Sequence, residues 1–349
     1  MVPPVNVLAL ATAVPPHKLE QTAVTEAARY AYARTFARYP KLADVFVNVG
    51  IDQRYSVRPL EWLSEPHNLA ERTDVYLESA GELFVQTARA ALDQARISAR
   101  DVDVVVTVSS TGIATPSIEA RVGPEMGFRP TVMRVPMFGR GCAGGVSGLT
   151  LGARLARAEP CEVVLVVVIE LCTLACRIDR GSKADVFSSA LFGDGAAAAV
   201  LRAGPPAADL KVGAAAEHTW PRTLDIMGWM IDPVGFRVML SRSLPRFVEQ
   251  KMAAPVRRFI KSAQLQAPRL ICHPGGAKVL DAIEVALDLQ KGTLRDERDV
   301  LRNYGNMSAP TVLFVLERVL QRSLRGPAML STLGPGFTVN LLALESMYG

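Results

Sequence analysis

The chain has 349 residues, of which 49% are hydrophobic and 21% charged, and this length suits two domains or one large duplicated domain with a buried core. The net charge of +5 is small for this length, so it predicts no nucleic-acid partner. It would suit anionic substrates, although an ordinary charged surface explains it more simply. No run of 18 apolar residues occurs, so we expect no transmembrane segment.

The five cysteines predict neither a metal site nor a disulfide framework. Cys172 and Cys176 stand four residues apart, but no second pair and no nearby histidine completes a zinc-binding set. Unpaired cysteines suit a reducing cytoplasm. The N-terminal segment lacks the basic start of a signal peptide, and its prolines flank an apolar run typical of a first strand. We therefore expect a cytoplasmic protein.

In chain order, apolar runs typical of strands alternate with helical patterns. The first half contains strands at 5–12, 101–110, 131–138, 162–170 and 195–202, with helices at 68–97 and 142–158. The run EVVLVVVIE at 162–170 is rich in β-branched residues throughout, as expected of a strand covered on both faces. The second half contains a strand that ends at 273, a helix at 310–320, and strands at 328–333 and 337–344. This alternation predicts an α/β fold of packed layers.

One spacing occurs in both parts of the chain. Ser109, at a strand end, lies 33 residues before Cys142, which opens a helix. His273, also at a strand end, lies 33 residues before Asn306, which precedes another helix. The equal spacing favours two structurally similar halves, with Cys142 and Asn306 in corresponding places.

A proline-rich stretch, GPPAA at 204–208, interrupts the alternation of strands and helices. Since proline and glycine punctuate regular structure, this stretch marks a boundary between two structural units. We therefore predict an N-terminal half at 1–205 and a C-terminal half at 206–349.

Cys142 is the candidate nucleophile. It lies in GRGCAGG, where Gly139, Gly141, Gly144 and Gly145 allow tight turns and a close approach of a substrate to the backbone. A helix follows, and the positive end of its dipole favours the thiolate, which is the reactive form of cysteine. A small buried cysteine in a glycine-rich turn is the structural alternative.

The same glycines allow a competing interpretation. Gly139, Gly141 and Gly144 spell G-x-G-x-x-G between a strand and a helix, and the next strand ends at Glu170. That pattern is formally a dinucleotide-binding fingerprint. It normally opens its domain, whereas here it lies in mid-chain and leaves Cys142 unexplained.

His273 and Asn306 are the candidate partners of Cys142. His273 ends an apolar strand before a Pro-Gly-Gly turn, a position that faces a cleft more often than a core. A histidine hydrogen-bonded within the turn is the alternative. Asn306, in YGNMSAP, precedes a helix and could serve only as its N-cap.

Together these segments resemble a known family. GCAGG, HPGGAKVLD, YGNMSAP, ALFGDGAAAAV at 190–200 and LGPGFTVN at 333–340 resemble the motifs of the type III polyketide synthases, the chalcone synthase-like branch of the thiolase superfamily. The resemblance runs from about residue 5 to 345 and is closest to bacterial alkylresorcinol and alkylpyrone synthases. It implies a thiolase-like layered αβαβα fold built from two similar halves, and a homodimer.

The resemblance also implies a catalytic role for three residues. Cys142 would be acylated by a starter thioester, and His273 would hold its thiolate in an ion pair. His273 and Asn306 would donate hydrogen bonds to the enolate that forms when malonyl-CoA loses carbon dioxide. The substrates are then acyl-CoA and malonyl-CoA, and no metal or redox cofactor is implied.

Further residues match cavity positions of the family. Phe192 and Phe236 match two phenylalanines that stand between the coenzyme A tunnel and the active cavity, although core packing would explain each of them alone. Ser308 matches a cavity position, and Lys41 matches a contact to a coenzyme A phosphate.

The segment after Glu170 bears on the substrate. It supplies small residues, including Cys172 and Ala175, where plant-type members have bulky or hydroxylated ones. We therefore expect a long-chain fatty acyl starter, donated by coenzyme A or by a carrier protein of a fatty acid synthase, and two or three malonyl extensions. Trp229 would fold the product for aldol closure to an alkylresorcinol in place of lactone closure to an alkylpyrone, or would only pack the cavity wall.

Two alternatives remain at this stage. The ketoacyl synthase III enzymes share a Cys–His–Asn set and perform a single condensation, but they usually carry an asparagine soon after the histidine, where this chain has Pro274 and two glycines. An acyl-binding scaffold without catalysis would have no use for the intact set of Cys142, His273 and Asn306.

Overall fold

The computed structural model describes residues 4–160, 162–179, 181–204 and 208–346. Its strands are β1 (Val5–Ala13), β2 (His17–Glu20), β3 (Gln53–Ser56), β4 (Val104–Val108), β5 (Met133–Met137), β6 (Val163–Leu171), β7 (Asp194–Ala203), β8 (Leu210–Thr219), β9 (Met227–Asp232), β10 (Gly235–Leu240), β11 (Arg269–Cys272), β12 (Gly326–Gly334) and β13 (Thr338–Ser346).

The helices are α1 (Gln21–Ala31), α2 (Ala33–Arg38), α3 (Val45–Asn48), α4 (Leu60–Leu63), α5 (Leu69–Ala95), α6 (Ile118–Met126), α7 (Gly144–Ala158), α8 (Lys183–Leu191), α9 (Leu244–Lys251), α10 (Ala253–Ser262), α11 (Ala277–Ala286), α12 (Arg295–Tyr304) and α13 (Thr311–Gln321). Short 3₁₀ turns include η1 (Pro40–Leu42), η2 (Ala99–Asp101), η3 (Gly141–Ala143) and η4 (Cys172–Ala175).

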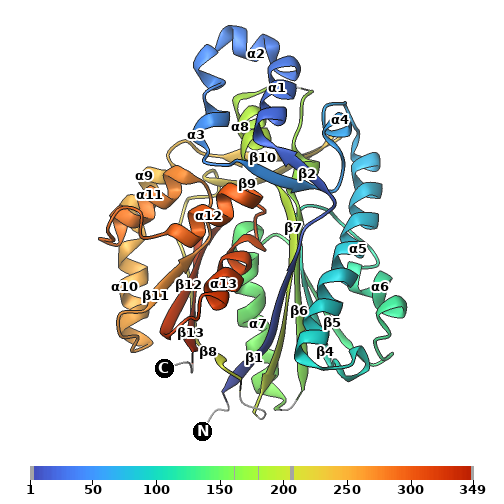
Figure 1. Ribbon diagram of the computed structural model, residues 1–349, viewed down its shortest axis with the longest axis vertical. Helices are drawn as coiled ribbons and strands as arrows, with labels where there is room; N and C mark the ends of the chain where they lie inside the picture. The colour runs from blue at the N-terminus through green and yellow to red at the C-terminus, as the bar shows by residue number, and fades with distance from the viewer. Residues whose placement is uncertain (1–3, 161, 180, 205–207, 347–349) are drawn as a thin grey trace.

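Nine of these strands form one sheet in the order β11-β12-β13-β8-β1-β7-β6-β4-β5. Strand β1 joins its two parts, because it pairs with β7 along its length and with β8 only at Val5–Val7. Figure 1 shows α7 and α13 in the middle of the molecule, with α5 and α6 outside one part of the sheet and α9, α10 and α11 outside the other. This confirms the predicted αβαβα layering.

The apolar run of β6 is buried on both faces, which explains why it lacks polar residues. Side chains alternate across a strand. Val164, Val166 and Val168 accordingly pack into the core around α7 and α13, while the residues between them pack into the core under α5. Full burial of each such side chain stabilises the fold by roughly 1.5–3 kcal/mol.

One connection occurs twice in the chain. Strands β4 and β6 are parallel and are joined through α7, after which β6 pairs antiparallel with β7. Strands β11 and β12 are likewise parallel and are joined through α13, after which β12 pairs antiparallel with β13. The two similar halves are therefore confirmed. The predicted boundary between residues 205 and 206 lies outside the described residues and stays a prediction.

Most predicted elements occur within a few residues of their expected ends. Helix α5 begins where Asn68 and Glu71 form a capping box, each side chain accepting a hydrogen bond from the other residue's backbone N–H. Strand β4 is shorter than predicted because the chain before it forms η2, capped by Ser98. None of the helices in the described ranges combines the length and apolar character that a membrane crossing requires.

Candidate active site

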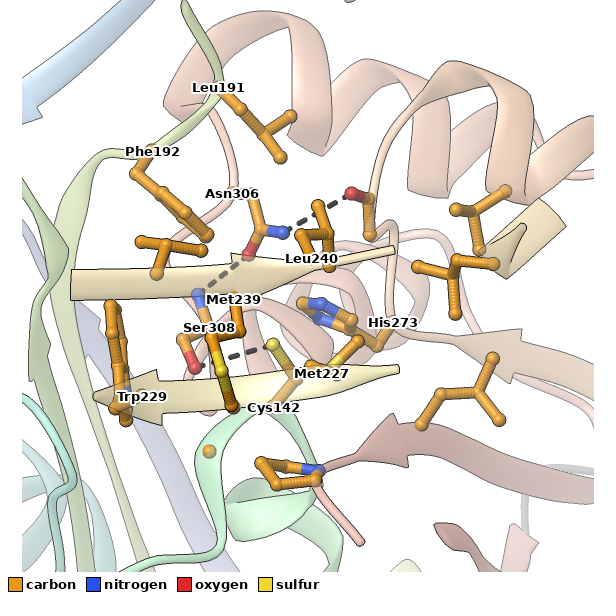
Figure 2. Close-up of a pocket in the computed structure, with 18 residues that line it drawn as sticks. Cys142, Leu191, Phe192, Met227, Trp229, Met239, Leu240, His273, Asn306 and Ser308 are labelled. Atoms are coloured by element: carbon orange, nitrogen blue, oxygen red, sulfur yellow. Dashed lines mark hydrogen bonds between the residues drawn. The ribbon is translucent and has the colours of Figure 1, made fainter. Parts of the chain in front are cut away.

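Cys142, His273 and Asn306 come from distant parts of the chain and line one cavity with about 650 Å³ of empty space. Cys142 lies in η3 directly before α7, His273 directly follows β11, and Asn306 precedes α13. All three are buried, with 8%, 5% and 3% of their surface exposed, respectively. Figure 2 shows their side chains directed into the same cavity.

The glycines around Cys142 allow the two halves of the chain to approach closely. A Cβ atom on Gly141 would lie 2.9 Å from the Pro335 ring, and one on Gly145 would lie 2.4 Å from the backbone oxygen of Ala309. The space beside these glycines is thus filled by protein. Two of the three glycines of the dinucleotide-binding pattern are packed against protein, Gly141 by Pro335 and Gly144 by Val108 and Ala309, and only Gly139 faces open space. This packing leaves no room for a pyrophosphate beside Gly141 and Gly144, and it argues against the dinucleotide-binding interpretation.

The Cys142 thiol is protonated in this environment. Burial raises its pKa to about 11, although the hydroxyl of Ser308 donates a hydrogen bond to the sulfur at 3.4 Å and acts in the opposite direction. We expected the α7 dipole to favour the thiolate. Cys142 does lie at the start of that helix, but desolvation of the thiolate outweighs the dipole.

His273 is neutral for the same reason. Burial lowers the pKa of its imidazole to about 3. Neither ring nitrogen has a hydrogen-bond partner within the described residues, although both are shielded from solvent. Buried polar groups are normally satisfied, and since His273 lines the cavity, its ring nitrogens are placed to bond a ligand there.

The Asn306 carboxamide is held in a fixed orientation. Its oxygen accepts a hydrogen bond from the backbone N–H of Ser308 at 2.8 Å, and its nitrogen donates to the backbone oxygen of Gly275 at 3.3 Å. One N–H of the amide therefore stays available toward the cavity. The N-cap alternative does not apply, because Pro310 precedes the first residue of α13.

Some of the other expected residues join this cavity and some do not. Phe192, Trp229 and Ser308 line it, and Trp229 lies between the two phenylalanines, with ring centres 6.3 Å from Phe192 and 6.2 Å from Phe236. Phe236 itself is buried behind Trp229 and does not line the cavity.

Cys172, Ala175 and Lys41 lie elsewhere. Cys172 and Ala175 are buried in η4, which is not part of the cavity lining. Lys41 is exposed in η1, in the region of α1, α2 and α3 at the top of Figure 1. The structure therefore does not bring Lys41 into contact with the cavity.

Much of the apolar lining had not been expected. Met227, Met239 and Leu240 come from the β9–β10 hairpin, Leu244 from α9 and Val279 from α11. The short runs MGWMID and GFRVML are rich in apolar residues and are separated by only Pro233 and Val234, but they do not alternate, so they indicate a hairpin only weakly. No sequence signal distinguishes an apolar residue that lines a cavity from one that fills a core.

A second, mainly apolar cavity adjoins the first at Phe192, which lines both, and Arg54 also forms part of its wall. Its other walls come from α1, α4 and the chain around η4, including Ala28, Leu63, Cys176 and Ile178. Phe192 is the residue that the two linings have in common. No cluster of metal-binding side chains occurs within the ranges that the structure describes.

Residues 3–205 match the family model for the N-terminal domain of chalcone and stilbene synthases, and residues 211–348 match that for the C-terminal domain. A 1,3,6,8-tetrahydroxynaphthalene synthase of Streptomyces peucetius subsp. caesius is 35% identical, with 97% of this chain and 93% of that one aligned. A 3,5-dihydroxyphenylacetyl-CoA synthase of Amycolatopsis orientalis is 31% identical over 88% and 86%. The crystal structure of the Streptomyces coelicolor A3(2) tetrahydroxynaphthalene synthase, a bacterial type III polyketide synthase, superposes with a TM-score of 0.92 at 26% identity, covering 99% of this chain and 100% of that one.

Proposed function

Because the chain belongs to the chalcone and stilbene synthase family and is a type III polyketide synthase that condenses malonyl-CoA, we propose that it extends a long-chain fatty acyl starter on Cys142 and cyclises the product. The observation that carries this proposal is the junction of two cavities at Phe192. One cavity holds the three reactive groups, and the other is apolar and suits an acyl tail.

In the loading step, the Cys142 sulfur attacks the carbonyl carbon of the starter thioester and its proton passes to His273. The adduct then collapses, the bond to the coenzyme A sulfur breaks, and that thiolate takes the proton from His273. Both groups are neutral before the reaction, so the proton transfer creates two charges of opposite sign. Their mutual attraction offsets part of the desolvation that each would suffer alone.

In the extension step, the carbon–carbon bond to the malonyl carboxylate breaks and carbon dioxide leaves. The electron pair moves toward the thioester oxygen, where a His273 N–H and the free Asn306 N–H stabilise the enolate. Loss of one such donor typically costs about 2.7–4 kcal/mol of transition-state stabilisation. The enolate carbon attacks the acyl group on Cys142, and the Cys142 thiolate leaves.

The wall of the cavity favours the neutral product of decarboxylation. Leu191 and Phe192 lie near Asn306 with their apolar side chains (Figure 2), and Val279 adds another apolar side chain to the lining of the same cavity. A carboxylate is poorly stabilised in such surroundings, whereas carbon dioxide has no charge to solvate. The role assigned to Phe192 rests on this placement, and Phe236 acts behind it by supporting Trp229.

The acyl tail of the starter lies in the second cavity. Cys176 and Ala28 provide small side chains there, and Leu63 and Ile178 provide apolar contacts. Cys172 and Ala175 shape this region from η4 without lining the first cavity. The starter arrives on coenzyme A, with Lys41 on the surface contacting a phosphate, or on a carrier protein of a fatty acid synthase.

The product is an alkylresorcinol, with an alkylpyrone as the competing outcome. Trp229 stands across the cavity from Cys142 and restricts the shapes that a tetraketide can take (Figure 2). The products named for the two relatives are hydroxylated aromatic rings, which supports closure through carbon.

The active form is a homodimer in the cytoplasm that needs no metal or redox cofactor. Strand β5 is an edge of the large sheet, and it carries Met133 and adjoins Phe138, each 55% exposed. The exposed side chains of Met133 and Phe138 form an apolar surface on which a second chain can pack, although Pro136 in the same strand donates no backbone hydrogen bond for strand pairing. Free cysteines within the described residues suit a reducing compartment.

The test supplies labelled malonyl-CoA with acyl-CoA starters from short to long and identifies the products by mass spectrometry, with Cys142→Ala as control. Cyclised products that require Cys142 and form fastest from long-chain starters would support the proposal. Activity confined to short starters would contradict the acyl-tail assignment. A single-round β-ketoacyl product would favour the ketoacyl synthase III alternative, and no product from any starter would favour the scaffold.

A further inference from the structure

Asn306 and Phe192 are fixed to each other through the backbone. The N–H of Asn306 donates to the oxygen of Leu191 at 3.0 Å, and the N–H of Gly193 donates to the oxygen of Asn306 at 3.1 Å. These two bonds form an isolated parallel bridge between the end of α8 and the turn before α13. Any shift of the α8 terminus therefore moves both cavity residues.

The guanidinium of Arg54, on β3, caps that helix end. It donates to the backbone oxygens of Ser189 at 2.7 Å, Ala190 at 3.0 Å and Phe192 at 3.1 Å, and also to the side-chain oxygen of Gln21. The last carbonyl groups of a helix have no partners within the helix, and a cation is favoured beside them. Arg54 supplies both the donors and the charge.

The stem of Arg54 also touches both sides of the bridge. A Cβ atom on Gly193 would lie 3.2 Å from the Cβ of Arg54, and one on Gly305 would lie 3.3 Å from it. Gly193 directly follows Phe192, and Gly305 directly precedes Asn306. Both glycines thus make room for the arginine at the point where the two segments meet.

Arg54 is buried, and within the described residues no carboxylate lies at ion-pair distance from it, although the charge of Asp194 acts on it from further away. Burial lowers the pKa of its guanidinium to about 10, so it still carries its charge at neutral pH. Burying a cation costs desolvation free energy, and such a group adds little to the free energy of unfolding compared with apolar packing. Its bonds to the carbonyls behind the cavity indicate a role in geometry.

We infer that Arg54 is a positioning residue that sets the orientation of Asn306 and Phe192 through the end of α8, an inference that rests on the oxyanion-stabilising role proposed for Asn306. Arg54 does not line the cavity that holds Cys142, His273 and Asn306 and touches no reacting atom there, although it forms part of the wall of the second cavity. The test therefore uses a reaction that needs no acyl starter. Arg54 holds the backbone at the end of α8, and the positions of the Asn306 carboxamide and the Phe192 ring depend on that backbone.

The test measures decarboxylation of malonyl-CoA in the absence of a starter, for wild type, Arg54→Lys and Arg54→Met. We expect kcat to fall about 10- to 100-fold with little change in KM, because misplacement of a catalytic group by about 1 Å costs roughly 100-fold. Alkylation of Cys142 by iodoacetamide should stay within about twofold of wild type, since η3 does not contact Arg54.

The matched control is Arg157→Lys. Arg157 also donates to two backbone oxygens, of Val212 and Gly213, but on α7 far from the cavity lining, and its variant should retain wild-type kinetics. A wild-type kcat in the Arg54 variants would overturn the inference. So would a parallel loss of decarboxylation, Cys142 alkylation and thermal stability, which would mean a general structural role.

Asn306→Ala in the same assay separates this inference from the proposed function. Unchanged decarboxylation in Asn306→Ala would remove the role of Asn306 itself, whereas a loss there with full activity in Arg54→Lys would remove only the role of Arg54. If both Arg54 variants fail to fold, Gln21→Leu replaces them. It removes the side-chain acceptor of the guanidinium and should lower kcat in the same selective way, and an unchanged kcat would again overturn the inference.

Discussion

The hydrogen bond from Ser308 to Cys142 provides a direct test of how the nucleophile is activated. The Ser308 hydroxyl donates to the sulfur at 3.4 Å, and such a donor stabilises the thiolate more than the thiol. A hydrogen bond to a charged group is worth about 1.5–3 kcal/mol, and one pKa unit corresponds to about 1.4 kcal/mol. Because this contact is long, we take the lower end and expect Ser308→Ala to raise the pKa of Cys142 by about one unit.

The assay is the rate of Cys142 alkylation by iodoacetamide as a function of pH. Below its pKa, a one-unit rise lowers the thiolate fraction about tenfold, so the Ser308→Ala profile should lie about one pH unit above that of wild type. Ser331→Ala is the matched control, because its buried hydroxyl has no hydrogen-bond partner within the described residues. Superimposable profiles for Ser308→Ala and wild type would refute the reasoning.

Three further predictions concern product, starter and pH. Trp229→Gly should shift the products from alkylresorcinols toward alkylpyrones by mass spectrometry, and an unchanged spectrum would leave Trp229 with packing alone. Cys176→Trp should fill the second cavity and shorten the longest accepted starter, with short starters still used; retention of long starters would place the tail elsewhere. Burial raises the pKa of Glu170 from 4.5 to about 8, so its contribution to stability is complete below about pH 4.5 and is lost as pH rises toward 8. In urea denaturation at a series of pH values, Glu170→Gln should flatten the decline of the unfolding free energy with pH. An unaltered slope of unfolding free energy against pH would contradict this prediction.

The sequence predicts the fold well where burial is complete. Strand β6 and helix α5 carry patterns long enough to be unambiguous, and the equal spacing around Cys142 and Asn306 reflects the real repetition of a strand–helix–strand unit. The β9–β10 hairpin was not predicted, because its strands are short, pair only with each other, and gain their position from packing over the cavity.

In the candidate site, sequence motifs indicated which residues are reactive, whereas the properties that depend on the folded surroundings could not be predicted. Glycine-rich turns indicated Cys142 and His273. Around Cys142 the glycines allow two segments to approach closely, and after His273 the turn uses Gly276 at a φ of 149°. The protonation of Cys142 could not be predicted, since the pKa depends on desolvation by residues from both halves. The capping of α8 by Arg54 is equally invisible in the sequence, where an arginine in a short strand suggests solvent exposure.

The most direct test of the proposed function is the mass of the protein after brief mixing with a long-chain acyl-CoA, without malonyl-CoA. The proposal predicts one added acyl group, located by peptide mapping to Cys142 and absent from Cys142→Ala, with His273→Ala much slower to acylate. An unmodified protein, or an acyl group on Cys172, Cys176 or Cys272, would contradict the assignment of Cys142 as the nucleophile.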